Sequence, residues 1–362
     1  MNILTPSDFT LLDDTATYIR RFVVLSDEAV TACVLWVAHT HVIRAAQVTP
    51  YLHPMSPDKE SGKTTLYDVL GRVCARPWQT AHATAAAIRR GLDTDPPPTL
   101  MIDEVETIFQ KQGDDFMRGV LDAGFRRGAT VSILERPSWV MRQFKVFGPK
   151  LLAGIGVLPD TVEGRCIPIV MRPKLPTDQV ERARERTLTA ASAPIISRFE
   201  TWTAECTDYL CEVEPPLPDF LSSRQMDFWE PLLAIADLFQ QGWPEQARAA
   251  AHLLHERHIE DSEGIELLRD IRDLFITEES EAMYSEEIVN KLLANEELRW
   301  KHIEFRGRLV ELDVWHLARF LREYSVRPYR MRLYIENDKQ ARGYHRDQFT
   351  DAWDRRLGPP SL

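Results

Sequence analysis

The chain has no run of eighteen apolar residues among its 362, so the sequence predicts no membrane-spanning helix. Its first residues, MNILTPSDFTLLDD, lack a basic stretch followed by an apolar one, and we therefore expect no secretion signal. The five cysteines are scattered, form no C-x-x-C pair and are odd in number, which argues against a disulfide framework. These absences predict a cytoplasmic protein that does not contact a membrane.

Negative charge exceeds positive charge over the chain as a whole. The net charge of −11 is a mild argument against non-specific binding to nucleic acid. The balance reverses between Arg299 and Arg356, where 14 Lys and Arg stand against nine Asp and Glu, a local charge of +5. A basic C-terminal module on an acidic body is typical of a protein that contacts nucleic acid with one part only. A solvated helix face is the alternative.

Residues 56–64 read SPDKESGKT, which is a phosphate-binding loop without its first glycine. The usual pattern is G-x-x-x-x-G-K-[ST], and Pro57 stands at the first glycine position. A polar turn that opens a helix is the alternative interpretation. The extended stretch Val48–Met55 before the loop, and apolar residues at helical spacing after it, favour a strand, a loop and a helix. We predict that ATP is bound by Ser61, Gly62, Lys63, Thr64 and Thr65.

An acidic pair follows a second apolar stretch. Asp103 and Glu104 come directly after Leu100–Ile102, and two adjacent carboxylates behind a buried strand are costly unless a cation or solvent meets them. ATP hydrolysis needs a lysine on the β and γ phosphates, a hydroxyl and an aspartate on Mg²⁺, and a second carboxylate that orients water. We assign the first role to Lys63, the second to Thr64 and Asp103, and the third to Glu104.

Strands that alternate with helices predict an α/β fold, with a parallel sheet covered by helices on both faces. Ligands bind such sheets at the carboxyl edge, where the phosphate-binding loop would lie. We find no clear sensor Asn or Thr after the fourth expected strand. The strands are expected near Val48–Met55, Trp78–His82, Thr99–Val105, Thr130–Leu134 and Arg165–Met171.

The pattern of expected helices and strands changes three times along the chain, which predicts four regions. Residues 1–45 form an N-terminal helical segment, and residues 46–173 form the P-loop ATPase core. Residues 174–275 are nearly all helical in pattern and form a lid. Residues 276–362, helices followed by a small hairpin, form a winged-helix-like domain, for which a generic protein-interaction module is the alternative. The DNA contacts of such a domain are expected at Arg319, Arg322, Arg327, Arg330 and Arg332.

Two arginines are candidates for completing the nucleotide site. Arg165 stands just before the last expected strand, where ring-forming ATPases carry an arginine that reaches the nucleotide of the neighbouring subunit. A surface arginine at the start of a strand is the alternative. Arg224 opens the helix that contains Trp229, and an arginine there can fold back onto the γ-phosphate of its own subunit. A surface ion pair is the alternative for Arg224.

Taken together, these residues resemble one family. The chain is similar to the primase/helicase-associated AAA+-like ATPases of bacterial mobile elements and phages, whose shared domain was long catalogued as one of unknown function. The segment Leu158–Cys166 also resembles the arginine-finger segment of clamp loaders, which supports Arg165. Besides the phosphate-binding loop and the acidic pair, the similar stretches include Leu35–His41, Asp122–Gly128, Phe147–Lys150, Ile155–Thr161, Trp229–Ala236 and Gly343–Phe349.

The resemblance implies an AAA+-like ATPase that uses ATP and Mg²⁺ in DNA replication of a mobile element. It would act as a homo-oligomer, in a hexameric ring, on single-stranded or forked DNA, as a replicative helicase or DNA motor. Relatives often carry a primase domain upstream, and we expect none here because the similar stretches begin near the start of the chain.

Two other functions stay open. One is an ATP-switched DNA-binding initiator or regulator that does not unwind processively. The other is a small-molecule P-loop kinase, against which the helical lid and the basic C-terminal module argue.

Overall fold

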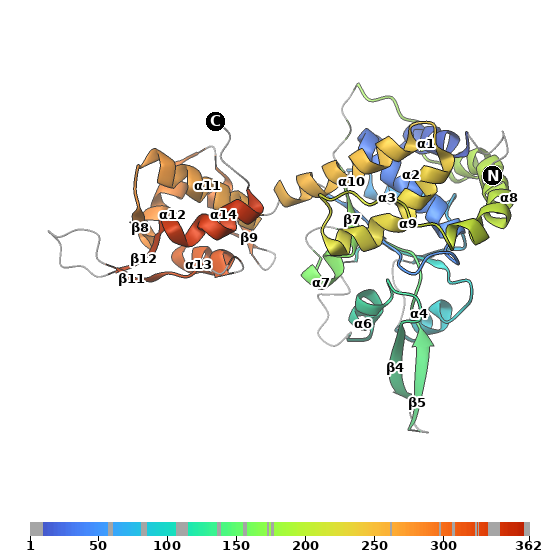
Figure 1. Cartoon of the computed structure of the whole chain (residues 1–362), viewed down its shortest axis with the longest axis horizontal. Coiled ribbons are helices and arrows are strands. Elements are labelled where there is room, and N and C mark those ends of the chain that lie inside the picture. Colours follow the sequence, from blue (N-terminus) through green and yellow to red (C-terminus); the bar gives the residue numbers. More distant parts are fainter. Residues whose placement is uncertain are drawn as a thin grey trace. The chain divides into compact units, whose positions relative to one another are not determined.

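A computed structural model of the chain describes residues 10–56, 61–80, 85–105, 115–135, 139–154, 158–171, 174, 177–260, 263–296, 298–305, 308–322, 324, 326–331 and 341–357. The chain divides into two compact units, residues 1–255 and 256–362. Figure 1 shows the helices and strands of both units.

The first unit is built on a five-stranded sheet. Its strands are β1 (Tyr51–Met55), β2 (Pro77–Thr80), β3 (Thr99–Ile102), β6 (Lys150–Leu152) and β7 (Cys166–Val170). All its strand pairs are parallel, and the order is β2-β3-β6-β1-β7. The strand before the phosphate-binding loop, β1, therefore lies inside the sheet. β3 reads TLMI and is buried throughout, as expected for a parallel sheet covered on both faces.

Helices cover both faces of this sheet. They are α1 (Leu11–Phe22), α2 (Asp27–His41), α3 (Lys63–Gly71), α4 (Ala85–Leu92), α6 (Asp115–Ala123), α7 (Asp160–Glu163), α8 (Glu185–Leu210), α9 (Ser223–Phe239) and α10 (Trp243–Glu260). Leu52 joins a core with α1–α3 and α8–α10, whereas Tyr51 joins a second core with α4, α6 and α7. Successive side chains of a strand point to opposite faces, so β1 contributes to both cores. The predicted α/β fold class is confirmed.

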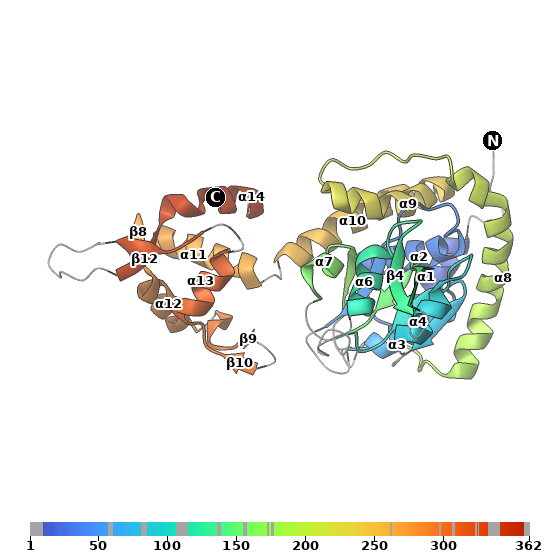
Figure 2. The same ribbon diagram turned by 90° about the horizontal axis from the view of Figure 1, so that it is seen from below.

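α2 lies in the first of these cores and fixes the start of β1. It is apolar around its whole circumference, and such a helix is stable only when it is enclosed. Ser26 caps its N-terminus by accepting a hydrogen bond from Ala29 N at 3.3 Å. Trp36 Nε1 donates to Pro50 O at 3.0 Å, one residue before β1 begins. Figure 2 shows the long helix α8 at one side of this unit. None of the helices in the described ranges is both long and apolar enough to cross a membrane.

The expected fourth strand of the sheet lies elsewhere. β4 (Thr130–Glu135) pairs antiparallel with β5 (Val140–Lys145) in a separate two-stranded hairpin. This hairpin projects away from the sheet and its helices (Figure 1). The fourth strand is β6, whose length of three residues and charged Lys150 hide it in the sequence. The prediction that Thr130–Leu134 joins the sheet is therefore wrong, whereas the other four expected strands are confirmed.

The second unit combines helices with short antiparallel strands. Its elements are α11 (Glu263–Thr277), β8 (Ala282–Tyr284), α12 (Ser285–Ala294), β9 (Ile303–Phe305), β10 (Arg308–Val310), α13 (Val314–Arg322), β11 (Tyr329–Met331), β12 (Ala341–His345) and α14 (Thr350–Arg356). β11, β12 and β8 form a three-stranded sheet in that order, and β9 pairs with β10. Helices α11–α13 precede the antiparallel pair β11–β12, and the assignment of this unit as a winged helix stays a prediction.

The border between the units differs from the expected one. α11 presents Leu268, Ile271 and Phe275 to the core of the second unit, where Trp300 and Tyr344 are also buried. The border between the units therefore lies after residue 255, whereas the sequence predicts it after residue 275. In the first unit, α1 and α2 share one core with α8–α10, so the N-terminal segment and the lid are not separate compact units. The reason is that each apolar face packs on a partner far away in the sequence.

Candidate functional site

The segments that follow several strands meet at the carboxyl edge of the sheet. Met171 N, after β7, donates a hydrogen bond to Met55 O at the end of β1, at 2.8 Å. Val105 N, after β3, donates to Ala153 O after β6, at 3.0 Å. Asp103 therefore lies at the same edge as the phosphate-binding loop, as the sequence predicts for a P-loop site.

Lys63 is the first residue of α3, and its side chain turns back toward Ser56 and Ser61. Its Nζ donates to Ser56 O at 3.3 Å and to Ser61 Oγ at 3.2 Å. Both serines are almost fully buried, with 2% and 5% of their surface exposed. The ammonium is thus held at the mouth of the loop, where a phosphate oxygen could replace these neutral acceptors. Sequence reasoning missed Ser56, whose role depends on its backbone carbonyl.

Gly62 occupies the N-cap position of α3 with φ of 89°, a left-handed conformation that favours glycine. A Cβ at Gly62 would lie 3.6 Å from Met171 Cε, an ordinary contact, so backbone conformation rather than space selects glycine. Thr64 is exposed and Thr65 half-buried in the first turn. The unpaired N–H groups of that turn and the helix dipole make it a favourable place for an anion.

Asp103 and Glu104 lie directly after β3. Asp103 Oδ1 accepts a hydrogen bond from Glu104 N at 3.0 Å. Partial burial raises the pKa of the Asp103 carboxyl, the neighbouring Glu104 carboxylate adds to this, and the Lys63 ammonium opposes it. Glu104 has φ of 56°, which is uncommon for a residue with a side chain and is a form of strain found at functional sites.

The oxygen donors at this edge fit Mg²⁺. Thr64 offers an exposed hydroxyl and Asp103 a half-buried carboxyl, and hard oxygen ligands of this kind are those that Mg²⁺ prefers. Across the described ranges no group of three or more His, Cys, Asp or Glu could hold a metal ion by itself. Mg²⁺ does not need such a group, because it keeps several waters and binds through one or two carboxylates and the substrate phosphates.

The residues after β6 carry no sensor side chain. Residues 153–157 read AGIGV, of which 155–157 lie outside the described ranges. The sequence predicts Thr130–Leu134 as the fourth strand of the sheet, and no sensor Asn or Thr was found after it. This segment belongs to the hairpin and not to the sheet. On the correct strand the sequence has neither residue.

Arg165 lies at the opposite edge of the sheet. It directly precedes β7, and its carbonyl accepts a hydrogen bond from Tyr51 N, at the start of β1, at 3.0 Å. Its guanidinium pairs with Asp122 at 3.0 Å, donates to Thr161 O and stacks on the Phe125 ring at 4.6 Å. The side chain is only 16% exposed. Arg165 thus lies at the edge of the sheet opposite Lys63 and Asp103, and its guanidinium is engaged within the chain by Asp122, Thr161 and Phe125.

Arg224 is an exposed side chain in the first turn of α9. One turn later, Asp227 pairs with Arg126 at 3.6 Å, and Arg126 forms a β-bridge with Val48, before the start of β1. The phosphate-binding loop follows the other end of β1, roughly 17 Å away for a five-residue strand. Arg224 therefore starts from the side of the other edge, and its contact with the γ-phosphate of its own subunit stays a prediction.

The arginines predicted to contact DNA are exposed wherever they are described. Trp315, one turn before Arg319 on α13, is 55% exposed, and the Arg319 guanidinium lies 5.6 Å from the centre of its ring. Sequence reasoning missed Trp315, although its spacing from Arg319 on one helix face was visible. Arg332 lies outside the described residues. The exposed set is Arg319, Arg322, Arg327 and Arg330.

A family model described as a protein of unknown function (DUF3631) matches residues 170–356, more than half of the chain. The uncharacterized 28.9 kDa protein in the xis 5′ region of Saccharopolyspora erythraea is 30% identical over 188 residues. That alignment covers 51% of this chain and 68% of the relative. The family match begins at the end of β7, so Lys63, Asp103 and Glu104 precede it and rest on their own geometry.

Solved structures share a distant likeness with the chain. The apo A form of the C-terminal region of NrS-1 has a TM-score of 0.40 and 12% identity, and the match covers 94% of this chain and 76% of that one. JCV helicase, with a thiazolopyridine compound bound, has a TM-score of 0.30 and 16% identity, with 70% and 63% covered. These scores and identities are too low to assign a function.

Proposed function

We propose that this chain, which belongs to the DUF3631 family, hydrolyses ATP with Mg²⁺ and uses the hydrolysis to work on DNA as a homo-oligomeric helicase or motor. The observation that carries the proposal is the meeting of Lys63, Asp103 and Glu104 at one edge of a parallel sheet. A lysine at the N-terminus of α3 and two carboxylates after β3 are the groups that phosphoryl transfer to water requires.

Each group has a separate task in this proposal. Lys63 exchanges its bonds to Ser56 and Ser61 for bonds to the β and γ phosphates, and Gly62 lets the backbone approach them. Thr64 and Asp103 hold Mg²⁺, which neutralises phosphate charge when it is bound. A cation beside Asp103 also favours the ionised carboxylate that partial burial disfavours. Glu104 accepts a hydrogen bond from the attacking water.

Two surfaces support contact with DNA. The hairpin β4–β5 exposes 61% of Trp139 and 68% of Met141, and Arg142 and Lys145 of β5 are exposed as well. Aromatic rings that stack on bases, combined with cations that meet phosphates, suit single-stranded DNA. In the second unit, the exposed Trp315 offers the same combination together with Arg319.

A homo-oligomer, in the form of a hexameric ring, completes the proposal. Arg165 precedes β7 at the edge opposite its own nucleotide residues, so its guanidinium can act only on the nucleotide of another subunit. The position of Arg165 supports assembly. While its guanidinium is paired with Asp122, the arginine is withdrawn from the nucleotide of any neighbouring subunit.

That withdrawn arginine also favours the second candidate, an ATP-switched DNA-binding initiator. An ATPase without its finger hydrolyses slowly and can stay in one nucleotide state for a long time, as a switch requires. The name of the Saccharopolyspora erythraea relative places it in the xis 5′ region, and we propose that this chain serves a mobile genetic element in either case.

Three measurements on the full chain test the proposal together: native mass with ATP and single-stranded DNA, DNA-stimulated ATP hydrolysis, and strand displacement on forked DNA. A motor assembles, hydrolyses ATP and displaces the strand, and Lys63→Ala loses both activities. A switch assembles and releases phosphate slowly without displacement. Wild-type protein that hydrolyses no ATP under these conditions, or Lys63→Ala with unchanged hydrolysis, would contradict the assignment of the nucleotide site.

A further inference from the structure

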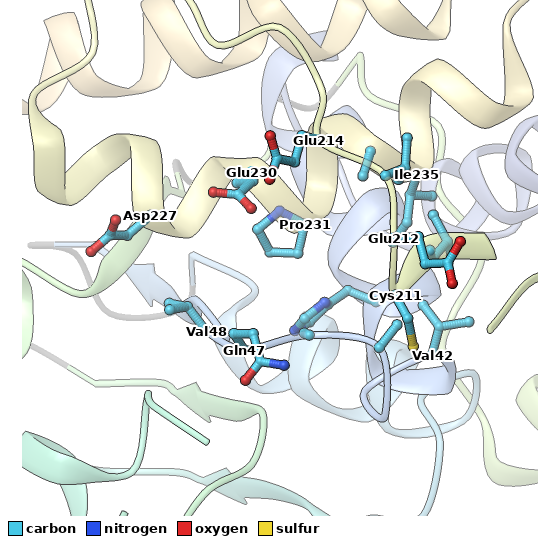
Figure 3. A pocket seen from close by; sticks show the side chains of 16 residues that line it. Val42, Gln47, Val48, Cys211, Glu212, Glu214, Asp227, Glu230, Pro231 and Ile235 are labelled. Atoms are coloured by element: carbon cyan, nitrogen blue, oxygen red, sulfur yellow. The ribbon is translucent and has the colours of Figure 1, made fainter. Parts of the chain in front are cut away.

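Two surface features of the described ranges are not explained by the nucleotide site. One is a cavity of about 260 Å³ in the first unit, between the end of α2, the segment before β1, the end of α8 and α9. Figure 3 shows Glu230 and Pro231 of α9 facing Gln47 and Val48 across it. Its lining includes the carboxylates of Glu214 and Glu230, which repel phosphates, so this cavity is no contact for DNA. The other feature is the outer side of α13 in the second unit (Figure 1).

The inner side of α13 fixes how this helix is turned. Leu317 and Leu321 are fully buried in the core of the second unit. Trp315, Arg319 and Arg322 follow one another at spacings of four and three residues, so they share one face, opposite the two leucines. These three exposed residues form the outer face of α13. A rotation that buried Trp315, which is 55% exposed, would bring both leucines into water, so its ring is held outside.

The first turn of α13 is fixed as well. Asp313 Oδ1 accepts a hydrogen bond from His316 N at 2.7 Å, and Asp313 O accepts one from Leu317 N at 2.9 Å. An aspartate that satisfies an N–H group of the first turn stabilises the start of a helix. The rings of Trp315 and His316 meet edge to face with their centres 5.0 Å apart. The Trp315 ring is therefore in place before a partner arrives, which reduces the entropy lost on binding.

The Trp315 ring already has a cation beside it. The Arg319 guanidinium lies 5.6 Å from the centre of this ring. At an exposed site such a contact is weaker than the stacking of a nucleic-acid base on an aromatic ring. A base can therefore take the place of the guanidinium on the ring, and the guanidinium then lies one helical turn away, within reach of a neighbouring phosphate.

The charge of this region favours a polyanion as the partner. Residues 299–356 have a net charge of +5, on a chain whose net charge is −11. Arg319 and Arg322 are the basic residues in the last turn of α13. A ring for stacking combined with cations for phosphates is the combination that binds single-stranded nucleic acid.

The start of α13 argues against duplex DNA. Relatives of the helix-turn-helix enter the major groove with the N-terminal residues of the recognition helix at the base edges. Here Asp313 exposes 61% of its side chain, and Glu311 before it is exposed too, so two carboxylates would approach the phosphates that flank the groove. The indole of Trp315 has a single N–H donor, whereas base edges are read best by bidentate side chains. An unpaired base offers its flat face instead.

We propose that the outer face of α13 binds an unpaired stretch of DNA and discriminates against duplex. Trp315 stacks on one base, and Arg319 and Arg322 bind the phosphates beside it. The choice of DNA as the partner rests on the proposed function, whereas binding at this face needs no ATP hydrolysis.

Cross-linking on the full chain without nucleotide detects the contact at a single residue. An oligothymidine that contains 5-iodouracil forms a bond with an aromatic side chain stacked on it under ultraviolet light, and peptide mass analysis identifies that side chain. Trp315 should be labelled. Unlabelled oligothymidine should suppress this label at least about fivefold better than a fully paired duplex with the same number of nucleotides, because paired bases do not expose their faces.

Variants separate stacking from charge. They are compared in chains that carry Trp139→Ala, so that the hairpin β4–β5 does not mask the second unit. Trp315→Ala should bind oligothymidine at least about fivefold more weakly, and Trp315→Phe should keep most of the affinity because phenylalanine still stacks. The double change Arg319→Ala and Arg322→Ala should flatten the salt dependence by roughly 0.7 per lost contact. Phe220→Ala, which removes a ring that is 50% exposed in the first unit, is the matched control and should bind like its parent.

Four results would each overturn the proposal: no binding of oligothymidine by the wild-type chain, no label on Trp315, equal suppression of the label by duplex, or unchanged affinity of Trp315→Ala. Retained affinity in Trp315→Phe shows that the loss in Trp315→Ala is not a loss of folding. ATP hydrolysis is measured separately. A chain that is labelled at Trp315 but hydrolyses no ATP contradicts only the nucleotide site, and a chain that hydrolyses ATP without this label contradicts only the contact at α13.

Discussion

Lys150 Nζ donates a hydrogen bond to Gly124 O at 3.1 Å, and a Cβ on Gly124 would lie only 2.5 Å from the same nitrogen. Lys150 is fully buried and also donates to the carbonyls of Val146 and Gly148, at 3.1 and 3.0 Å. The ammonium uses all three of its donors on backbone carbonyls, which offsets part of the cost of burying a charge. This arrangement joins α6, the end of the hairpin and the start of β6.

The close approach at Gly124 predicts a large effect of a small substitution. Gly124→Ala should lower the free energy of unfolding by about 2–4 kcal/mol, because the added methyl group displaces the ammonium from its acceptors. Gly119→Ala on α6 is the matched control, since its Cβ would meet only Val131 at ordinary contact distance and alanine favours the helix. Chemical denaturation of both variants measures the difference. Equal stabilities would show that Lys150 can move without cost.

The role assigned to Glu104 predicts that binding and hydrolysis separate. Glu104→Gln should bind ATP like the parent but hydrolyse it about 10²–10⁴-fold more slowly, because the water loses its acceptor. Lys63→Ala should also weaken binding, because its ammonium is the cation at the mouth of the loop. Titration with a fluorescent ATP analogue and a phosphate-release assay measure the two quantities. Hydrolysis by Glu104→Gln at the parental rate would rule out the assignment of the acidic pair.

The pair Arg165–Asp122 predicts opposite outcomes for its two members. If Arg165 serves a neighbouring subunit, Arg165→Ala should bind ATP normally and lose about 10³-fold or more in turnover. Asp122→Asn, which releases the guanidinium, should then keep or raise turnover. Mixed particles of Arg165→Ala and Lys63→Ala should recover some activity, since each supplies what the other lacks. Similar losses of stability in Arg165→Ala and Asp122→Asn, with no recovery on mixing, would mean that the pair only holds β7 to α6.

The arginines assigned to DNA contact in the second unit predict that DNA binding depends on salt. Changing Arg327, Arg330 and Arg332 to Ala should weaken binding and flatten its salt dependence, by roughly 0.7 per lost contact on single strands. Trp315→Ala should weaken binding without changing the salt slope, because it removes stacking rather than charge. Electrophoretic titration at two salt concentrations measures both. If the triple variant binds DNA like the parent, this unit docks a protein instead.

Buried histidines predict how stability depends on pH. Burial lowers the pKa of His39 to about 3 and that of His41 to about 4, whereas both titrate near 6.5 when unfolded. As the pH falls below 6.5, the unfolded chain gains protons that the folded chain does not. The free energy of unfolding should therefore fall between about pH 6.5 and 4, by about 1.4 kcal/mol per pH unit for each histidine. Above pH 6.5 these two groups should contribute no slope.

Hydrogen exchange of the α2 amides measures this pH-dependent loss of stability in the first unit. His39→Gln should reduce the slope by the share of one histidine, and His302→Gln, at an exposed position, should leave it unchanged. An identical slope in His39→Gln would show that His39 is already protonated in the folded chain at mildly acid pH.

The features that the sequence predicted well are local ones. The loop at Ser61–Thr65 and the pair Asp103–Glu104 each belong to one strand and the turn after it, so their neighbours in sequence are their neighbours in space. The edge of a parallel sheet then brings the two together without further information. The same reasoning found the α/β class and the hairpin of the second unit, whereas β8, β9 and β10 were not predicted.

The features that the sequence did not predict depend on distant partners. β6 was missed because Lys150 looks like a surface residue until the carbonyl of Gly124 is placed beside it. The pattern at Arg224 marks the start of a helix but does not say which edge of the sheet that helix meets. The cavity beside His39 combines the ends of two helices that lie about 170 residues apart in sequence, and no local motif describes it.

The hairpin β4–β5 begins and ends at one place, because Thr130 pairs with Lys145. The next pair, Val131 and Phe144, still packs on the first unit, but the residues beyond it leave the body of the unit and return to the same place, and β6 follows from there. The outer part of the hairpin can therefore be exchanged as one segment. Evolution can lengthen it, shorten it or rewrite its tip without rebuilding the sheet, and a protein engineer can graft another loop through the same two anchor positions to change what the molecule touches.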